Sequence, residues 1–331
     1  MAKERSRRKT GKQAKGAGFG RRLPRFLFRS SLLLLLAVLA LVASYAFGSL
    51  EQRRGIERTA INLTDPLRLS ERTPALIAGL LNRFHDRLPS SVGFYVDGGE
   101  LERAEGALLA GVPESPQPLL LLWNQSYVNL YNEAERHAAC LAFRALPSRR
   151  TTGGEPMLRT DSRVPGLTPQ DALMGPWVPT TLLPVEALAG HAGVETAARE
   201  AHLATALFPV KPNFADRIWF RLMRKIATEY PRRFGEIWIL CGPLFRTDQS
   251  KLSTGVPLPD AFFAVALDLT DEGGLRALSF IVPVDAKEDQ PLSDFLSSIE
   301  TVERHSGLQL LPQVRVESLD PLRKWCATDL W

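Results

Sequence analysis

Short apolar runs bounded by polar or turn-forming residues recur through the chain after residue 90. Runs of this length, flanked by Gly, Pro, Asn or charged residues, predict strands. They lie at 91–96, 119–124, 236–242, 262–269 and 277–284. The stretch 126–146 predicts a hairpin, because two apolar runs flank a polar turn at 132–136.

Other segments place their apolar residues at the spacing of a helix face. This pattern predicts helices at 73–88, 194–206 and 213–229. A further helix is predicted over 291–307, with Pro291 at its start and Gly307 at its end. Strands that come in runs, with helices between some of them, indicate an α+β fold built on an antiparallel sheet.

An uncharged apolar run, Leu32–Leu50, lies near the N-terminus. At a rise of about 1.5 Å per residue its nineteen residues reach nearly 30 Å, about the hydrocarbon thickness of a bilayer. We therefore predict a single transmembrane helix at 31–50. A cleaved signal peptide, with Ser44-Tyr45-Ala46 as its cleavage site, is the alternative. The apolar run is longer than the apolar region of a usual signal peptide, and the basic tail is longer than its N-terminal region. Both lengths favour the transmembrane anchor.

The excess positive charge of the chain lies before this apolar run. Residues 1–29 contain eleven Lys or Arg and one acid, Glu4, a charge of +10, whereas the whole chain carries +5. The remainder therefore carries −5, which argues against broad phosphate-backbone binding by the globular part. A basic tail at 1–30 predicts a cytoplasmic N-terminus, contact of residues 1–50 with membrane lipid, and a C-terminal domain in the periplasm or an equivalent space.

The three cysteines, Cys140, Cys241 and Cys326, leave at least one without an intramolecular partner. Cys140 and Cys241 lie in apolar runs and are predicted to be buried, while the pairing stays open. The chain contains no GxSxG, P-loop, HExxH or Cys/His zinc spacing. The sequence therefore carries no signal for the chemistries that these motifs support.

Several segments between 111 and 314 fall in a family-specific order. They are the hairpin at 126–146, RTDSRV at 159–164, GPWVP at 175–179, a long helix leading to a strand that ends in Gly-Pro at 217–245, and the closing strands and helix. In this order they resemble the DNA/RNA non-specific endonuclease family, the ββα-metal nucleases. The resemblance implies an antiparallel sheet core with flanking helices at 113–316. A connecting region at 51–112 then precedes it, and a C-terminal tail at 317–331 follows.

The resemblance also implies a chemistry. In the family a His acts as general base towards water, a Mg²⁺ held by an Asn polarises the phosphate, a Glu supports the water shell and an Arg steadies the charge. On alignment the base position falls on Pro176, the metal-ligand position on Ala215 and the Glu position on Met223. Arg163 alone matches the family. Losing the other three groups together predicts an inactive nuclease domain with a binding or scaffolding role.

Only Gly175 survives from the family's Asp-Arg-Gly-His motif, in which Leu173 and Met174 stand for the Asp and the Arg. The family's separate Ser-Asn…Pro-Gln segment becomes Thr205-Ala206…Pro209-Val210.

A rearranged active site is the competing hypothesis. His191 follows a glycine and is a candidate base, with Arg163 beside it and Mg²⁺ as cofactor. Asn213 and Asp216 flank the lost ligand position and are weak candidates to hold the metal, although an N-cap or solvated role is the simpler one for both. The remaining histidines have no partner at metal-binding spacing and are expected to be ordinary surface or core residues: His85, His137, His202 and His305.

A third hypothesis is a structural protein of the cell envelope whose partner is an envelope protein unrelated to nucleic acid.

Overall fold

The computed structural model describes residues 94–99, 101, 106–147, 157–270 and 273–331, together with single positions between 40 and 81. The basic tail, the predicted transmembrane segment and most of the predicted helix at 73–88 lie outside the described residues. Within the described part, no helix is long and apolar enough to cross a bilayer. The chain divides into two compact units, residues 1–65 and 66–331, and nearly all described residues belong to the second.

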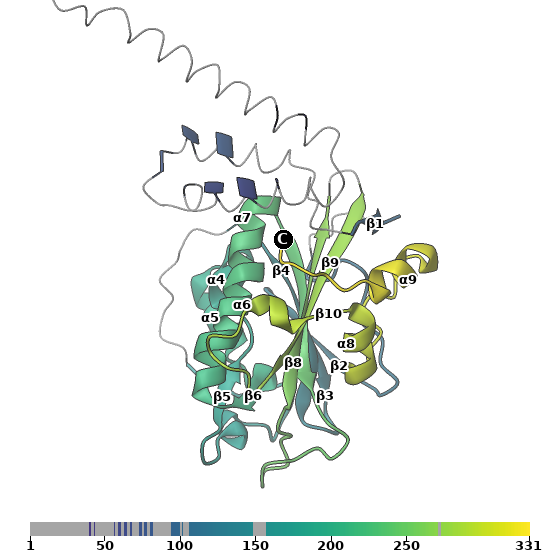
Figure 1. The fold of residues 1–331 in the computed structure, drawn as a ribbon. Helices are drawn as coiled ribbons and strands as arrows, with labels where there is room; N and C mark the ends of the chain where they lie inside the picture. The colour runs from purple at the N-terminus through teal and green to yellow at the C-terminus, as the bar shows by residue number, and fades with distance from the viewer. Residues whose placement is uncertain are drawn as a thin grey trace, which may run out of the picture. The chain divides into compact units, whose positions relative to one another are not determined.

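The second unit is built on an eight-stranded antiparallel sheet (Figure 1). Its strand order is β1-β9-β8-β7-β4-β3-β2, and β10 pairs with β9. The strands are β1 (Val96–Asp97), β2 (Leu120–Trp123), β3 (Val128–Asn132), β4 (His137–Ala145), β7 (Ile237–Leu244), β8 (Ala261–Leu269), β9 (Gly274–Pro283) and β10 (Leu296–Ser297). The predicted α+β class, the hairpin and the strands of the sheet core are confirmed.

The central strands are buried on both faces, which explains their nearly continuous apolar sequences. All eight residues of β7 are buried. Alternate side chains enter two separate cores. Ile239 and Cys241 lie in the first core, and Trp238 and Leu240 lie in the second core. In Figure 1, α4–α7 cover one face of the sheet, while α8 and α9 lie on the other.

The cysteines follow this alternation. Cys140 and Cys241 are buried, as predicted, and they lie in different cores. Cys326 is exposed, and all three cysteines are free thiols. Burial raises the pKa of the Cys140 thiol to about 12.

The layer over the first core consists of helices and a small second sheet. The helices are α4 (Val185–Ala192), α5 (Val194–Ala201) and a helical stretch made of η3 (Phe214–Trp219), α6 (Phe220–Arg224), η4 (Lys225–Glu229) and α7 (Tyr230–Phe234). Two short 3-10 helices, η1 (Pro169–Ala172) and η2 (Ala204–Ala206), flank β5 (Val178–Thr181) and β6 (Leu207–Val210), which pair antiparallel.

The sequence had not predicted β5, β6 or α4. The helix predicted at 213–229 continues to Phe234, and the one predicted at 194–206 is interrupted after Ala201.

The helix predicted from Pro291 is wrong in its first half. Residues 292–297 form η5 (Leu292–Phe295) and β10, and α8 (Ile299–Ser306) begins after Ser298. The Ser298 hydroxyl accepts a hydrogen bond from the Thr301 amide at 3.2 Å, a normal N-cap. Gly307 ends the helix with a φ of 71°, as predicted.

Both ends of the predicted domain extend further than the resemblance implied. Residues 317–331, predicted as a tail, contribute most of α9 (Val316–Lys324), and Trp331 is buried in the first core. The Trp331 amide donates to the Tyr230 hydroxyl at 3.1 Å. On the N-terminal side, Leu109 and Ala110 are buried in the second core. These segments therefore belong to the same compact unit.

We predict that Gly242→Ala destabilises the protein by about 1–3 kcal/mol, because an added methyl overpacks the sheet. A Cβ at Gly242 would lie 2.4 Å from the Ala139 carbonyl oxygen and 2.9 Å from the Phe263 ring. The measurement is thermal unfolding of the full chain in detergent. Gly190→Ala is the matched control, since its nearest neighbour, the Leu146 Cβ, is 3.5 Å away. Equal melting temperatures for the two variants would contradict this packing.

Candidate functional site

A pocket of about 550 Å³ lies between β5, α5 and the start of the helical stretch. Three segments, distant in sequence, supply its walls. They are Thr180–Glu186, the α5 end with Ala198 and His202, and the helical residues Ala215, Asp216, Trp219, Phe220 and Met223. The lining is therefore largely apolar, with a few polar side chains among it.

Trp219 connects two walls of this pocket. Its indole N–H donates to the Leu182 carbonyl at 2.9 Å, which ties the helical stretch to the segment after β5. The ring is buried and packs against Phe262 and Phe214, with centroids 5.7 and 6.1 Å away. A buried aromatic with its single donor satisfied gives the pocket a rigid floor.

Two of the positions that the resemblance assigns to chemistry line this pocket. Ala215, at the metal-ligand position, and Met223, at the position of the supporting acid, both belong to the lining. Neither a methyl group nor a thioether is a ligand that Mg²⁺ accepts, because it prefers hard oxygen donors. Among the described residues no group of three or more His, Cys, Asp or Glu is arranged to hold a metal ion. The donor set here does not fit the family's metal.

Pro176, at the position of the general base, lies outside the pocket lining. It is exposed in a tight turn in which Met174 and Trp177 exchange backbone hydrogen bonds of 3.1 and 3.2 Å. Gly175, with a φ of 59°, allows this turn. A proline side chain has no group that accepts or donates a proton, so the turn supplies no base.

Of the two candidates to hold a metal, Asp216 lines the pocket and Asn213 does not. Asn213 is exposed at the N-cap of η3 and makes no side-chain capping bond. Asp216 is exposed and lines the pocket, one residue after Ala215.

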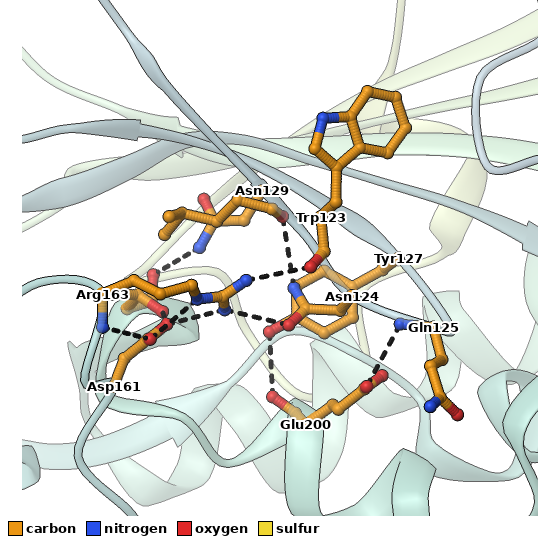
Figure 2. Close-up of polar contacts among 10 residues, drawn as sticks. Trp123, Asn124, Gln125, Tyr127, Asn129, Asp161, Arg163 and Glu200 are labelled. Carbon is orange, nitrogen blue, oxygen red and sulfur yellow. Dashed lines mark hydrogen bonds and ion pairs between the residues drawn. The ribbon is translucent and has the colours of Figure 1, made fainter.

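Arg163 is held by internal contacts (Figure 2). Its guanidinium donates to both carboxylate oxygens of Asp161 at 2.9 and 2.8 Å, to the Trp123 carbonyl at 2.9 Å and to the Asn124 side chain at 2.9 Å. The hydrogen bond to Asp161 raises the pKa of the Arg163 guanidinium above its usual value. A guanidinium engaged on three sides is a structural crosslink between the loop at 157–164 and the end of β2.

Asp161 is the buried partner in this crosslink. Besides Arg163, the Thr205 hydroxyl donates to it at 2.7 Å. Burial alone would raise the pKa of the Asp161 carboxyl, but the hydrogen bonds from Arg163 and Thr205 outweigh it and bring the pKa below the ordinary value. The carboxylate is therefore ionised in the folded state at neutral pH.

Glu200, at the end of α5, completes the network in Figure 2 and was not predicted from the sequence. Its buried carboxylate accepts hydrogen bonds from the Gln125 amide at 3.1 Å and from the Ser126 amide and hydroxyl at 3.1 and 2.7 Å. The Tyr127 hydroxyl donates to the Glu200 carbonyl at 2.8 Å, and burial, reinforced by Glu200, raises the pKa of Tyr127 well above its usual value.

One signal in the sequence pointed to Glu200. It shares the apolar side of α5 with Ala197 and Ala201, three residues before it and one after, both buried. An acid on the apolar side of a helix needs donors from elsewhere.

His191 contacts a different strand from Arg163. It sits near the end of α4, where its Nε2 is 2.9 Å from the Arg144 carbonyl on β4, whereas Arg163 contacts the end of β2. Burial lowers the pKa of His191. Neither His191 nor Arg163 is among the residues that line the pocket.

The remaining histidines have ordinary environments, with one difference. His202 lines the pocket, and its Nδ1 lies 2.7 Å from the Ala198 carbonyl. His137 packs against Phe245, His305 is exposed on α8, and His85 lies outside the described residues.

Comparison with known proteins agrees with this architecture. The sequence profile of the DNA/RNA non-specific endonuclease family matches residues 221–317. Mitochondrial endonuclease G of Bos taurus is 27% identical over 140 residues, covering 39% of this chain and 46% of the relative. The Homo sapiens protein is 26% identical over 140 residues, covering 39% and 47%. The chain thus spans about half the length of these curated relatives.

A solved structure of the EndoG/EndoGI complex, which concerns the mechanism of EndoG inhibition, superposes with a TM-score of 0.54 at 16% identity. It covers 61% of this chain and 90% of that chain. Together these matches show that the chain has the fold of the DNA/RNA non-specific endonuclease family, as the sequence predicted. Among the relatives found, the likeness is to endonuclease G.

We predict that Asp161→Asn destabilises the protein by about 1–3 kcal/mol at neutral pH, because Arg163 and Thr205 lose their charged acceptor. The pKa of Asp161 is lower in the folded than in the unfolded chain. Its contribution is therefore present above the unfolded value, about 4, and is lost as the pH falls through the folded value.

The difference in unfolding free energy between wild type and Asp161→Asn should thus narrow below about pH 4. Chemical denaturation at a series of pH values measures it. Asp216→Asn, at an exposed carboxylate, is the control and should match wild type at every pH. If the difference in unfolding free energy between wild type and Asp161→Asn stays the same below about pH 4, the role of Asp161 in this network is contradicted.

Proposed function

We propose that this chain is a catalytically inactive relative of endonuclease G, anchored in a membrane, that uses its pocket to bind a protein of the cell envelope. The observation that carries the proposal is the lining of the pocket. Ala215 and Met223 stand in it at the positions of the family's metal ligand and acid, with Pro176 at the position of the base. The fold and a pocket are present, and the groups that would perform hydrolysis are replaced.

The charge of the chain supports a partner other than nucleic acid. Residues after the basic tail carry a net charge of −5, which disfavours association with a polyanion. Arg163, the one group retained of the four that the family uses for its chemistry, is engaged by Asp161, Trp123 and Asn124 and has little capacity left for a phosphate.

An active, Mg²⁺-dependent nuclease is the alternative function, and a cleavage assay separates the two. The full chain, purified in detergent, is incubated with supercoiled plasmid and Mg²⁺ or Mn²⁺, with and without EDTA, beside endonuclease G as positive control. We expect no metal-dependent nicking by this chain, because the pocket lacks a base and a metal ligand. Nicking that EDTA abolishes, and that is lost in His191→Ala or Asp216→Asn, would contradict the proposal.

The proposed anchor rests on the apolar run at 32–50 and the basic tail before it. Lys and Arg concentrated on one side of such a run keep that side cytoplasmic. The pocket-bearing domain would then face the periplasm or an equivalent space, where its partner would be an envelope protein.

We predict that the full chain stays with membranes after alkaline carbonate extraction and keeps its first 30 residues, as intact mass reports. External protease should digest the globular domain in spheroplasts while an N-terminal tag stays protected. Replacing the basic residues of the tail with neutral ones is the control, and should weaken this orientation. A soluble chain that begins shortly after Ala46 would instead establish the cleaved signal peptide.

A further inference from the structure

The pocket carries two carboxylates that the fold does not use. Glu186, near the start of α4, and Asp216, in η3, both line it and are exposed. Neither forms an ion pair or a side-chain hydrogen bond with any described residue. The two charges come from separate elements, so their presence at one pocket is a tertiary arrangement.

Among the described residues, the pocket lining supplies no Lys or Arg partner for these two carboxylates, and His202 is the basic residue found in it.

Three arginines of η3 and α6 have partners outside the pocket lining. Arg217 pairs with Glu288, Arg221 donates to the Glu288 and Gln290 carbonyls at 2.5 and 2.6 Å, and Arg224 lies 3.6 Å from Glu229. The two carboxylates of the lining favour a cation over a phosphodiester at the pocket.

Apolar groups make up most of the remaining lining. Trp219 and Met223 are buried, and Met adapts its shape to different apolar occupants. Phe220 is 52% exposed, so its ring is accessible to the stem or the charged head of a Lys or Arg. A volume of about 550 Å³ is that of an ordinary ligand pocket and accommodates a few side chains.

We infer that this pocket binds a short segment of a partner protein in which apolar side chains are flanked by Lys or Arg. The apolar side chains cover Trp219 and Met223, and the basic ones pair with Glu186 and Asp216. This inference rests on the proposed function and specifies the chemistry of its partner. It assigns the two carboxylates to recognition and predicts that the pocket disfavours nucleic acid.

The test uses the full chain in nanodiscs of zwitterionic lipid, so that a basic probe does not bind the lipid. The probes are two fluorescein-labelled peptides with the same Leu and Phe residues, one carrying Lys and the other Glu between them. Fluorescence polarisation at low salt measures their affinities. We expect the Lys peptide to bind at least about tenfold more tightly, with affinity that falls as salt rises.

Three variants locate the binding. Asp216→Asn and Glu186→Gln should each weaken the Lys peptide several-fold, whereas Ala215→Trp should abolish its binding by filling the pocket. Glu195→Gln removes the same charge from α5 at a position outside the lining and should change nothing. Unchanged melting temperatures establish that the variants fold.

Equal affinity for the two peptides would overturn the inference, as would an equal loss in Glu195→Gln. Binding of a labelled single-stranded oligonucleotide that Ala215→Trp abolishes would also overturn it, because a polyanion would then occupy the pocket. The cleavage assay is independent of these outcomes. If the chain cleaves DNA in a metal-dependent way and still prefers the Lys peptide, only the proposal of an inactive enzyme is contradicted. If it does not cleave DNA and binds both peptides equally, only the inference about the pocket is contradicted.

Discussion

Burial of β4, β7 and β8 on both faces is the constraint on which the rest of this fold depends. Every residue of β7 is inaccessible to water, and its side chains alternate between a core covered by α4–α7 and a core covered by α8 and α9. Apolar burial of this extent is the dominant favourable contribution to folding. The pocket lies in the outer layer, but four of its lining residues also belong to the first core: Leu182, Leu183, Trp219 and Met223. Its other lining positions can therefore change with less effect on the sheet.

A polar network joins that outer layer to the edge of the sheet. Asp161, Arg163 and Glu200 hold the loop at 157–164 and the end of α5 against the β2–β3 connection, through hydrogen bonds of 2.7–3.1 Å. A buried network of this kind is stabilising only when its members are satisfied, and these carboxylates and this guanidinium are. Arg163 thus resembles a family residue and also has a structural role in this chain. In the recognition that we propose, Glu186 and Asp216 at the pocket supply the charges.

The elements that local sequence specifies were predictable, and those that depend on distant contacts were not. Strands β7, β8 and β9 are continuous apolar runs between turn residues. The hairpin is recognisable from the polar turn at 132–136 between its two apolar runs. In contrast, β5 and β6 carry Pro179 and Pro209 and are stabilised by pairing with each other. The paired residues are 32 positions apart at Val178↔Val210 and 26 at Thr181↔Leu207. The pocket escaped prediction for the same reason, since three separate segments build it. The family positions, by contrast, were readable from order and spacing, and two of the three were found in one pocket.

The central claim is that the pocket persists without the metal chemistry of its relatives. A crystal structure of the chain grown with Mn²⁺, with anomalous diffraction data collected at the manganese edge, tests this most directly. The account predicts no anomalous peak in the pocket between Ala215 and Met223. A bound Mn²⁺ there, with Asp216, Glu186 or His202 among its ligands, would contradict it and would show that the metal site has moved instead of being lost.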